Sequence, residues 1–215
     1  MRFAGVIFDL DGTLADTRED LADAMNRVLA AEGLPVHDSD SFGAMIGAGL
    51  RNLVTLALPT DRRTDEAIAR CAAAMMADYG RHCLVKTRLY DGIAETVARL
   101  RAGAVRLAVL SNKPDELTRR IVEGLLQAGD FEEVAGARPD TPPKPDPAAA
   151  LRIGRRLGLA AGSIAFLGDT GIDMATATAA GMFAVGASWG FRSSGELLDS
   201  GAQAVLAHPL ELLDL

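Results

Sequence analysis

The chain has 215 residues, 49% of them hydrophobic, and a formal net charge of −7. This length and composition allow a sizeable core, built as one large domain or as a core with an insertion. Because acidic and basic residues are interspersed along an acidic chain, we expect neither nucleic acid nor an anionic membrane as a partner, and no apolar run approaches the length of a membrane span.

Residues Ala4–Leu10 form the first predicted strand, an apolar run with two carboxylates at its end. Asp9 and Asp11 are two residues apart, and a turn after Asp9 brings both to one pole of a sheet. Gly12 lets the backbone approach an anion closely. Such a pole can hold Mg²⁺ and attack phosphorus. The alternative is an Asx-type turn, in which the Asp11 carboxylate only accepts hydrogen bonds from nearby N–H groups.

The next part of the chain, about 70 residues long, has a helical pattern without a convincing strand. Amphipathic stretches such as Leu21–Glu32 and Glu66–Tyr79 place apolar residues at helical spacing. We therefore predict an inserted all-helical cap domain over residues 16–85 and a catalytic core made of residues 1–15 and 86–215. Two linker segments join these parts, and this topology permits hinge opening over a site between them.

Further short apolar runs alternate mostly with helical patterns over the rest of the chain. The alternation predicts an α/β fold with a parallel sheet that helices cover on both faces. Ligands of such sheets bind at the carboxyl ends of the strands. The remaining predicted strands are Arg106–Ser111, Glu133–Gly136, Ser163–Gly168, Met182–Ala187 and Ala204–Ala207.

Polar clusters follow the first two of these strands. After the strand that ends at Ser111, the Ser111 hydroxyl and the Asn112 amide can bind a phosphate oxygen. Prolines then restrict the backbone around Lys144, and we expect a helix to start at Pro147 with Asp146 as its N-cap. The Lys144 ammonium is therefore predicted to lie at a loop-to-helix junction.

A last cluster follows the strand that ends at Gly168 and holds two acids four residues apart, Asp169 and Asp173. This spacing suits a metal site with one direct ligand and one supporting carboxylate. The chain has three lysines against nineteen arginines, yet Lys113 and Lys144 both lie in these strand-end loops. A compact ammonium is thus used selectively there.

Each cluster alone is a weak signal, since Ser–Asn after a strand is common turn chemistry and a lysine among prolines is often a solvated loop charge. Together and in order, the four clusters resemble the four motifs of the haloacid dehalogenase-like superfamily. The resemblance implies a Rossmann-like parallel sheet flanked by helices, with the helical cap inserted. Within the superfamily, Asp9–Leu29 and Ile46–Arg51 resemble the phosphoglycolate phosphatase group.

The resemblance implies a Mg²⁺-dependent phosphomonoesterase, a phosphatase with two catalytic carboxylates. Asp9 is the expected nucleophile, which forms an aspartyl-phosphate, and Asp11 protonates the departing oxygen and then activates water. The metal is expected at the Asp9 carboxylate, the Asp11 backbone carbonyl and Asp169. The phosphoryl oxygens are expected at Ser111, Asn112 and Lys144. The residues expected to support the ligands and loops are Asp173, Thr13 and Thr170.

The expected substrate is a small phosphorylated metabolite, with 2-phosphoglycolate first. Arg51, in a Gly-rich loop with Gly49, is the candidate to bind the substrate carboxylate through two parallel hydrogen bonds. The alternative for Arg51 is a solvated arginine at a helix start.

Other functions remain open at the sequence level. A sugar phosphomutase or a pyrophosphatase of the same superfamily shares the core motifs, whereas a dehalogenase has no need of Asp11. A non-enzymatic phosphoacceptor or regulatory protein is a remote alternative, because such switches need no cap. We expect a cytoplasmic protein, since the first strand begins at the N-terminus with no cleavable leader and Cys71 and Cys83 are expected to be free thiols. The expected oligomeric state is a monomer or a homodimer.

Overall fold

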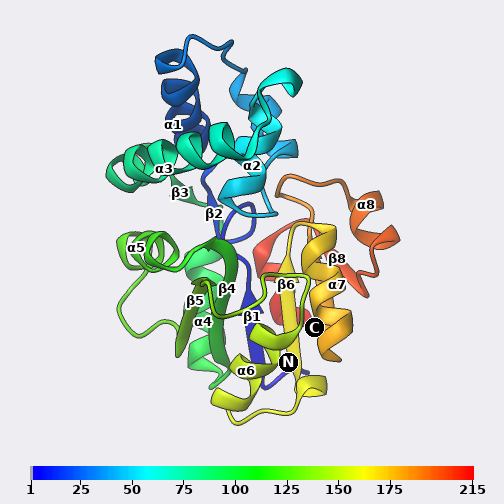
Figure 1. Ribbon diagram of the computed structural model, residues 1–215. Helices are drawn as coiled ribbons and strands as arrows, with labels where there is room; N and C mark the ends of the chain where they lie inside the picture. The colour runs from blue at the N-terminus through cyan, green and yellow to red at the C-terminus, as the bar shows by residue number, and fades with distance from the viewer. Residues whose placement is uncertain (1) are drawn as a thin grey trace.

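The structure is a computed structural model that describes residues 2–215, and it consists of a sheet-containing core below a helical cap (Figure 1). The core holds one six-stranded sheet in the order β5-β4-β1-β6-β7-β8, in which every neighbouring pair is parallel. This confirms the predicted α/β class, and each predicted strand is present. The strands are β1 (Gly5–Phe8), β4 (Arg106–Pro114), β5 (Glu133–Ala137), β6 (Ile164–Gly168), β7 (Phe183–Ala187) and β8 (Ala204–Leu206).

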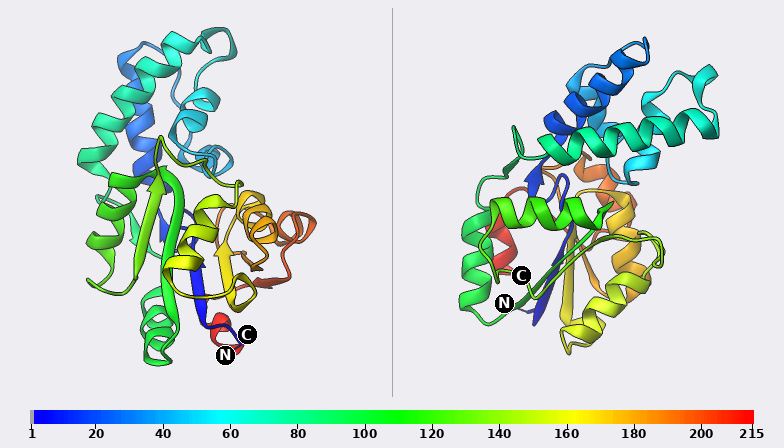
Figure 2. Two further views of the ribbon diagram at one scale, coloured as in Figure 1. Left: turned by 60° about the horizontal axis from the view of Figure 1, so that its bottom comes forward. Right: turned by 60° about the vertical axis from the view of Figure 1, so that its left-hand side comes forward.

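Helices cover both faces of the sheet (Figure 2), which explains why the strands are apolar on both sides. Along β1, Val6 and Phe8 pack into one apolar cluster and Ile7 packs into the other, because successive side chains of a strand point to opposite faces. The core helices are α4 (Ile93–Ala102), α5 (Asp115–Leu125), α6 (Ala148–Arg156), α7 (Gly171–Ala180) and α8 (Ser194–Asp199), with the short 3-10 helices η3 (Ala161–Ser163) and η4 (Pro209–Asp214).

The helix after Lys144 begins one residue later than predicted. Pro147 occupies the capping position of α6, and the Asp146 carboxylate accepts a hydrogen bond of 2.8 Å from the Ala148 amide. Asp146 therefore still satisfies a free N–H of the first turn, as an N-cap does.

The cap consists of helices that pack around buried side chains such as Met25, Phe42 and Met75. Both amphipathic stretches expected from the sequence are helical, and the two longest cap helices, α1 and α3, pack against each other (Figure 1). The cap elements are α1 (Arg18–Ala31), η1 (Ser39–Ala44), α2 (Leu50–Ala57), η2 (Thr60–Arg62) and α3 (Asp65–His82).

The two linkers between cap and core pair with each other as β2 (Ala15–Asp16) and β3 (Arg88–Leu89), an antiparallel ribbon. Between these two strands the chain is helical, as expected for about Asp16–Val85, and the strands themselves were not predicted because a two-residue strand leaves no periodicity to detect. The Asp20 carboxylate, in the first turn of the first cap helix, accepts hydrogen bonds from the Lys86 and Thr87 amides and so holds the second linker beside that helix. The ribbon lies close to both predicted ends of the cap, residues 16 and 85, and the exact limits of the cap stay a prediction.

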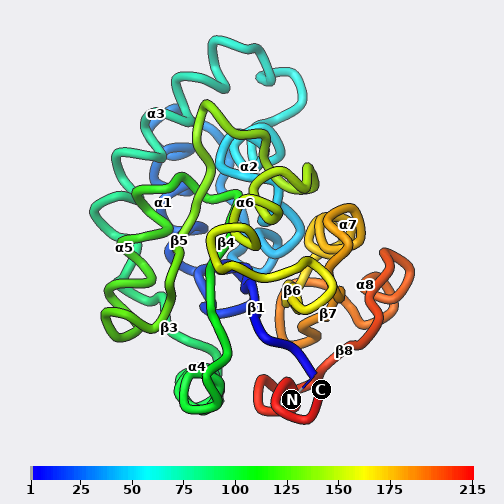
Figure 3. The backbone as a smooth tube through the Cα atoms, turned by 90° about the horizontal axis from the view of Figure 1, so that it is seen from below, coloured from blue at the N-terminus to red at the C-terminus, as the bar shows by residue number. Residues whose placement is uncertain are grey.

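The two ends of the described chain lie side by side (Figure 3), at the end of the core that faces away from the cap (Figure 1). There the Arg2 amide donates a hydrogen bond of 3.2 Å to the Leu215 carbonyl. The carboxyl ends of the strands therefore face the cap, where the predicted site residues gather. Within residues 2–215, no helix combines the length and the apolar character that crossing a membrane requires.

Candidate active site

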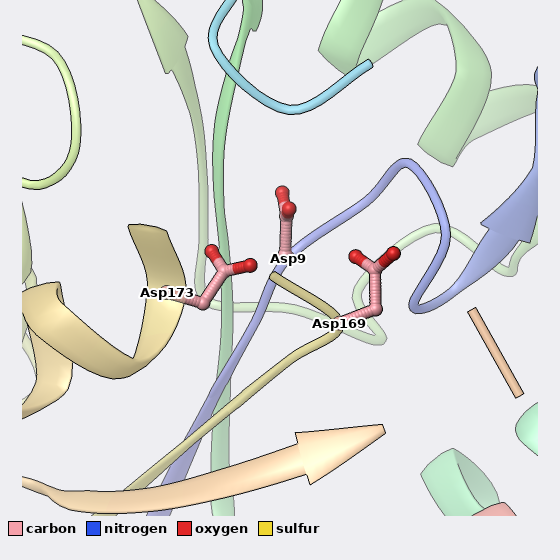
Figure 4. Close-up of side chains that lie close together, drawn as sticks. All are labelled: Asp9, Asp169 and Asp173. Carbon is pink, nitrogen blue, oxygen red and sulfur yellow. The ribbon is translucent and has the colours of Figure 1, made fainter. Parts of the chain in front are cut away.

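Three buried carboxylates meet where β1 and β6 end (Figure 4). Asp9 follows β1, Asp169 follows β6, and Asp173 lies in the first turn of α7. Each contributes an oxygen that lies within 4.8 Å of the others. The two strands are neighbours in register, with Phe8 opposite Leu167, so the residues that follow them must lie close together. The structure thus brings together the acids that the sequence places far apart.

Lys144 connects two of these acids. Its Nζ atom lies 3.0 Å from Asp9 Oδ1 and 2.6 Å from Asp173 Oδ1, and all three side chains are buried. Burial raises the pKa of Asp9 to about 7, with Asp173 and Asp11 adding to the rise and Lys144 opposing it. Burial lowers the pKa of Lys144, but the attraction of Asp173 and Asp9 outweighs it and keeps this pKa above its ordinary value.

Asp173 and Asp169 have different partners. Asp173 Oδ2 accepts hydrogen bonds from the Thr170 amide and hydroxyl, at 3.1 and 2.7 Å, so both of its oxygens are engaged. Asp169 accepts from the Thr13 hydroxyl at 3.2 Å and from the Phe191 amide at 2.8 Å. Among the described residues, Asp169 has no cationic partner, and burial raises its pKa well above the ordinary value.

Asp11 follows Asp9 by two residues and is paired with a different cation. Its Oδ1 atom accepts a hydrogen bond of 2.6 Å from the Thr17 hydroxyl and lies 3.0 Å from Lys113 Nζ. Lys113 Nζ also donates to the Tyr79 hydroxyl at 3.1 Å. The sequence analysis singled out Lys113 as one of few lysines but assigned no role to it, to Tyr79 or to Thr17.

The Asn112 side chain holds the loop that carries Lys144. Its Oδ1 atom accepts a hydrogen bond of 2.8 Å from the Lys144 amide, and its Nδ2 atom donates to the carbonyls of Lys144 and of Gly47 in the cap, at 3.0 and 3.2 Å. A side chain so engaged positions Lys144, and only the backbone amide of Asn112 is left for a phosphate. The neighbouring Ser111 hydroxyl accepts from the Lys113 amide at 3.3 Å.

A small cavity separates the core from the cap at this point. The cavity has a volume of about 410 Å³, including its opening to solvent. Its core side is lined by Asp9, Asp11, Ser111, Asn112, Lys113, Pro114 and Leu117, and its cap side by Leu21, Ile46, Gly47, Gly49, Leu50, Leu53 and Tyr79.

Residues 6–187 match the sequence pattern of the haloacid dehalogenase-like hydrolases. The chain belongs to this family. The matched range includes the acid cluster, both buried lysines and the helices of the cap.

Individual relatives of this haloacid dehalogenase-like hydrolase are phosphatases. The phosphoglycolate phosphatase of Rhodospirillum rubrum is 35% identical over 192 residues, which cover 86% of this chain and 80% of that protein. The N-acetylmuramic acid 6-phosphate phosphatase of Pseudomonas putida is 30% identical, and the matched region covers 99% of this chain and 95% of that protein. The crystal structure of a predicted phosphoglycolate phosphatase from Haemophilus somnus superposes with a TM-score of 0.90 at 27% identity, covering 100% of this chain and 98% of that one.

These comparisons confirm the predicted resemblance to phosphoglycolate phosphatases and the predicted class, a phosphoric monoester hydrolase. They also account for the fold, because a parallel sheet with an inserted cap recurs in the solved relative.

Arg51 of this hydrolase does not reach the cavity. Its side chain is 59% exposed, and its Nη2 atom lies 2.7 Å from Asp65 Oδ1 on the cap surface. Leu50 and Leu53 of α2 line the cavity, and a residue one position after Leu50 points about 100° away around a helix. Gly49 does line the cavity, with a φ of 87° that favours glycine. The structure therefore supports the position of Gly49 and not the expected substrate contact of Arg51.

Arg192, which the sequence analysis did not single out, joins the core to the cap. From the loop after β7, its guanidinium donates to three backbone carbonyls at the end of η1 and beyond: Gly43 at 2.6 Å, Ala44 at 3.3 Å and Ile46 at 3.2 Å. We call this contact the Arg192 clasp. Like the Asn112–Gly47 hydrogen bond, it joins a core side chain to the backbone of the cap segment between η1 and α2.

Proposed function

We propose that the protein is a Mg²⁺-dependent phosphatase that hydrolyses a small phosphorylated carboxylate, 2-phosphoglycolate first, through an aspartyl-phosphate on Asp9. The observation that carries this proposal is the separate pairing of two carboxylates on one small cavity. Asp9 is paired with Lys144 within the acid cluster, while Asp11 is paired with Lys113 away from it. Two acids with different surroundings can take different chemical roles.

The residues present fit a divalent cation. When all are ionised, the four carboxylates of Asp9, Asp11, Asp169 and Asp173 face only two ammonium groups, those of Lys113 and Lys144. The deficit of two positive charges equals the charge of Mg²⁺, and buried carboxylate oxygens are ligands that this ion prefers. Asp9 and Asp169 would hold it, with the Asp11 carbonyl as the third protein ligand. When bound, Mg²⁺ neutralises charge on the phosphoryl oxygens.

The side chains then divide the work of two displacements. In the first, an Asp9 oxygen bonds to phosphorus as the bond to the ester oxygen breaks, and Asp11 gives its proton to that departing oxygen. In the second, Asp11 takes a proton from water, whose oxygen attacks phosphorus and releases Asp9 as a free carboxylate. Lys144, the Ser111 hydroxyl and the Asn112 amide hold the phosphoryl oxygens in place.

The contacts of the two remaining acids predict different metal responses. Asp169→Asn should raise the Mg²⁺ concentration for half-maximal activity by more than about 100-fold, because it removes a direct ligand. Asp173→Asn should act more mildly, about 10- to 100-fold, because the Asp173 oxygens already accept from Lys144 and Thr170. Mg²⁺ titration of activity, with calorimetric titration of the ion alone, measures both. The reverse ranking would make Asp173 the direct ligand.

The substrate proposal is supported by the lining of the cavity. Its apolar cap wall suits a substrate without additional hydroxyl groups, because each unpaired polar group buried there costs about 1–3 kcal/mol. A second candidate is N-acetylmuramic acid 6-phosphate, favoured by relatives that cover 99% and 100% of this chain. Sugar phosphate mutation and pyrophosphate hydrolysis are the other reactions to be tested.

A side-by-side screen with Mg²⁺ tests this choice. We expect kcat/KM for 2-phosphoglycolate to exceed that for N-acetylmuramic acid 6-phosphate, hexose phosphates and pyrophosphate by at least about tenfold, the factor that one unpaired polar group supplies. A preference for the muramic acid ester would replace the substrate and leave the phosphatase mechanism in place. Release of an isomerised sugar phosphate instead of inorganic phosphate would contradict the proposed reaction.

The proposed cellular setting is the cytoplasm, with the enzyme acting as a monomer or homodimer. The two cysteines support a reducing compartment, because Cys71 and Cys83 are both buried free thiols.

A further inference from the structure

We infer that Lys113 binds the carboxylate of the substrate and that the Tyr79 hydroxyl positions its ammonium for this contact. The inference rests on the proposed function, since it concerns how a phosphorylated carboxylate is recognised in the same cavity. It replaces Arg51 with a residue that the sequence analysis left without a role.

The lining of the cavity leaves one candidate cation. Among the described residues that line it, Lys113 is the only one with a positive charge. Lys144 is not among the residues that line the cavity, and its ammonium is paired with Asp9 and Asp173. Arg51 lies on the cap surface with Asp65. A second anionic group in the cavity can therefore find its countercharge only at Lys113.

Lys113 has a donor to spare. An ammonium has three N–H groups. In the structure one donates to the Tyr79 hydroxyl at 3.1 Å, and the Nζ atom also lies 3.0 Å from Asp11 Oδ1 as an ion pair. Within the described part of the chain no further oxygen pairs with this ammonium, although the residue is only 5% exposed. A buried donor without a partner costs free energy that a ligand oxygen would recover.

The position of Lys113 matches the length of a short substrate. Its Nζ atom lies 3.0 Å from Oδ1 of Asp11, the group proposed to protonate the ester oxygen. In 2-phosphoglycolate the carboxylate carbon is two bonds from that oxygen, so the carboxylate and the ester oxygen fall on neighbouring groups, Lys113 and Asp11. The Tyr79 ring, whose centroid is 4.5 Å from Lys113 Nζ, closes the site from the cap.

The surrounding wall strengthens this contact and limits its ligands. Leu21, Ile46, Leu50, Leu53 and Leu117 exclude water around the ammonium, and a charge-assisted hydrogen bond is stronger in such surroundings. The same wall offers no partner for the hydroxyl groups of a sugar. The inferred ligand class is a phosphate ester whose carboxylate is separated from the ester oxygen by a short apolar spacer.

The test measures binding without proton transfer, because Lys113 also contacts the catalytic Asp11. Two non-hydrolysable compounds, 3-phosphonopropionate and propylphosphonate, differ in the carboxylate, and their dissociation constants with the Mg²⁺-loaded full chain are measured by calorimetry. We expect the unaltered protein to bind 3-phosphonopropionate about 10- to 100-fold more tightly. In Lys113→Met this ratio should fall to near one, whereas Arg51→Ala should keep it within about twofold of the original.

Lys113→Gln is the second variant, since its amide can still donate to Asp11 if Lys113→Met fails to fold. A ratio that survives in the Lys113 variants overturns the inference and leaves the proposed function standing. A ratio lost in Arg51→Ala assigns the contact to Arg51 instead. Absence of any preference in the unaltered protein refutes the proposed carboxylate substrate itself, before any variant is compared.

Discussion

Replacement of Asp9 by Asn is expected to abolish turnover, lowering kcat by at least about 10⁴-fold. The amide cannot attack phosphorus as the carboxylate does, while its size preserves the packing at the end of β1. The variant should still fold and should still bind phosphate esters in the presence of Mg²⁺. Steady-state kinetics, with circular dichroism to confirm folding, measures the effect, and mass spectrometry should find no phosphorylated chain.

Asp130→Asn is the matched control for this variant. Asp130 is also a largely buried carboxylate with a cationic partner, Arg101 at 2.7 Å, but it lies near β5 and away from the cavity. It should lower stability without a comparable loss of kcat. Unaltered turnover by Asp9→Asn would remove Asp9 from the role of nucleophile.

Asp11→Asn is expected to trap the phosphoenzyme. With an aryl phosphate, whose leaving group needs no proton, Asp9 should still be phosphorylated, but hydrolysis of the aspartyl-phosphate should slow by about 10²- to 10⁴-fold because no base activates water. Rapid-quench measurement of protein-bound phosphate follows both steps. Asp16→Asn, which changes a nearby acid in β2 that accepts from the Arg18 amide, is the control. Dephosphorylation at the original rate in Asp11→Asn would assign the base to another group.

The parallel sheet and the acid cluster could be predicted from the sequence because both depend on local patterns. A buried parallel strand is an apolar run, and polar residues that follow such runs must meet at one edge of the sheet. Asp9 and Asp169 therefore needed no knowledge of the tertiary structure beyond the order of the strands. The same reasoning placed Lys144 correctly next to them.

The cap side of the site could not be predicted in this way. Whether Arg51 or Leu50 faces the cavity depends on the rotation of α2, which is set by packing against α3 and not by the loop before it. Lys113 reaches Asp11 because β4 continues to Pro114, three residues beyond the predicted end. Tyr79 reads as an ordinary core residue of an amphipathic helix, and only the docking of cap on core gives its hydroxyl a partner.

The Arg192 clasp holds the cap by its backbone and not by its side chains. Its acceptors are the carbonyls of Gly43, Ala44 and Ile46, and the Asn112 contact likewise ends on the Gly47 carbonyl. Because these bonds use the cap backbone, the side chains that line the cavity can be exchanged without removing any of them. Substitution of the cap side chains that line the cavity should therefore alter substrate preference and leave these core–cap hydrogen bonds in place.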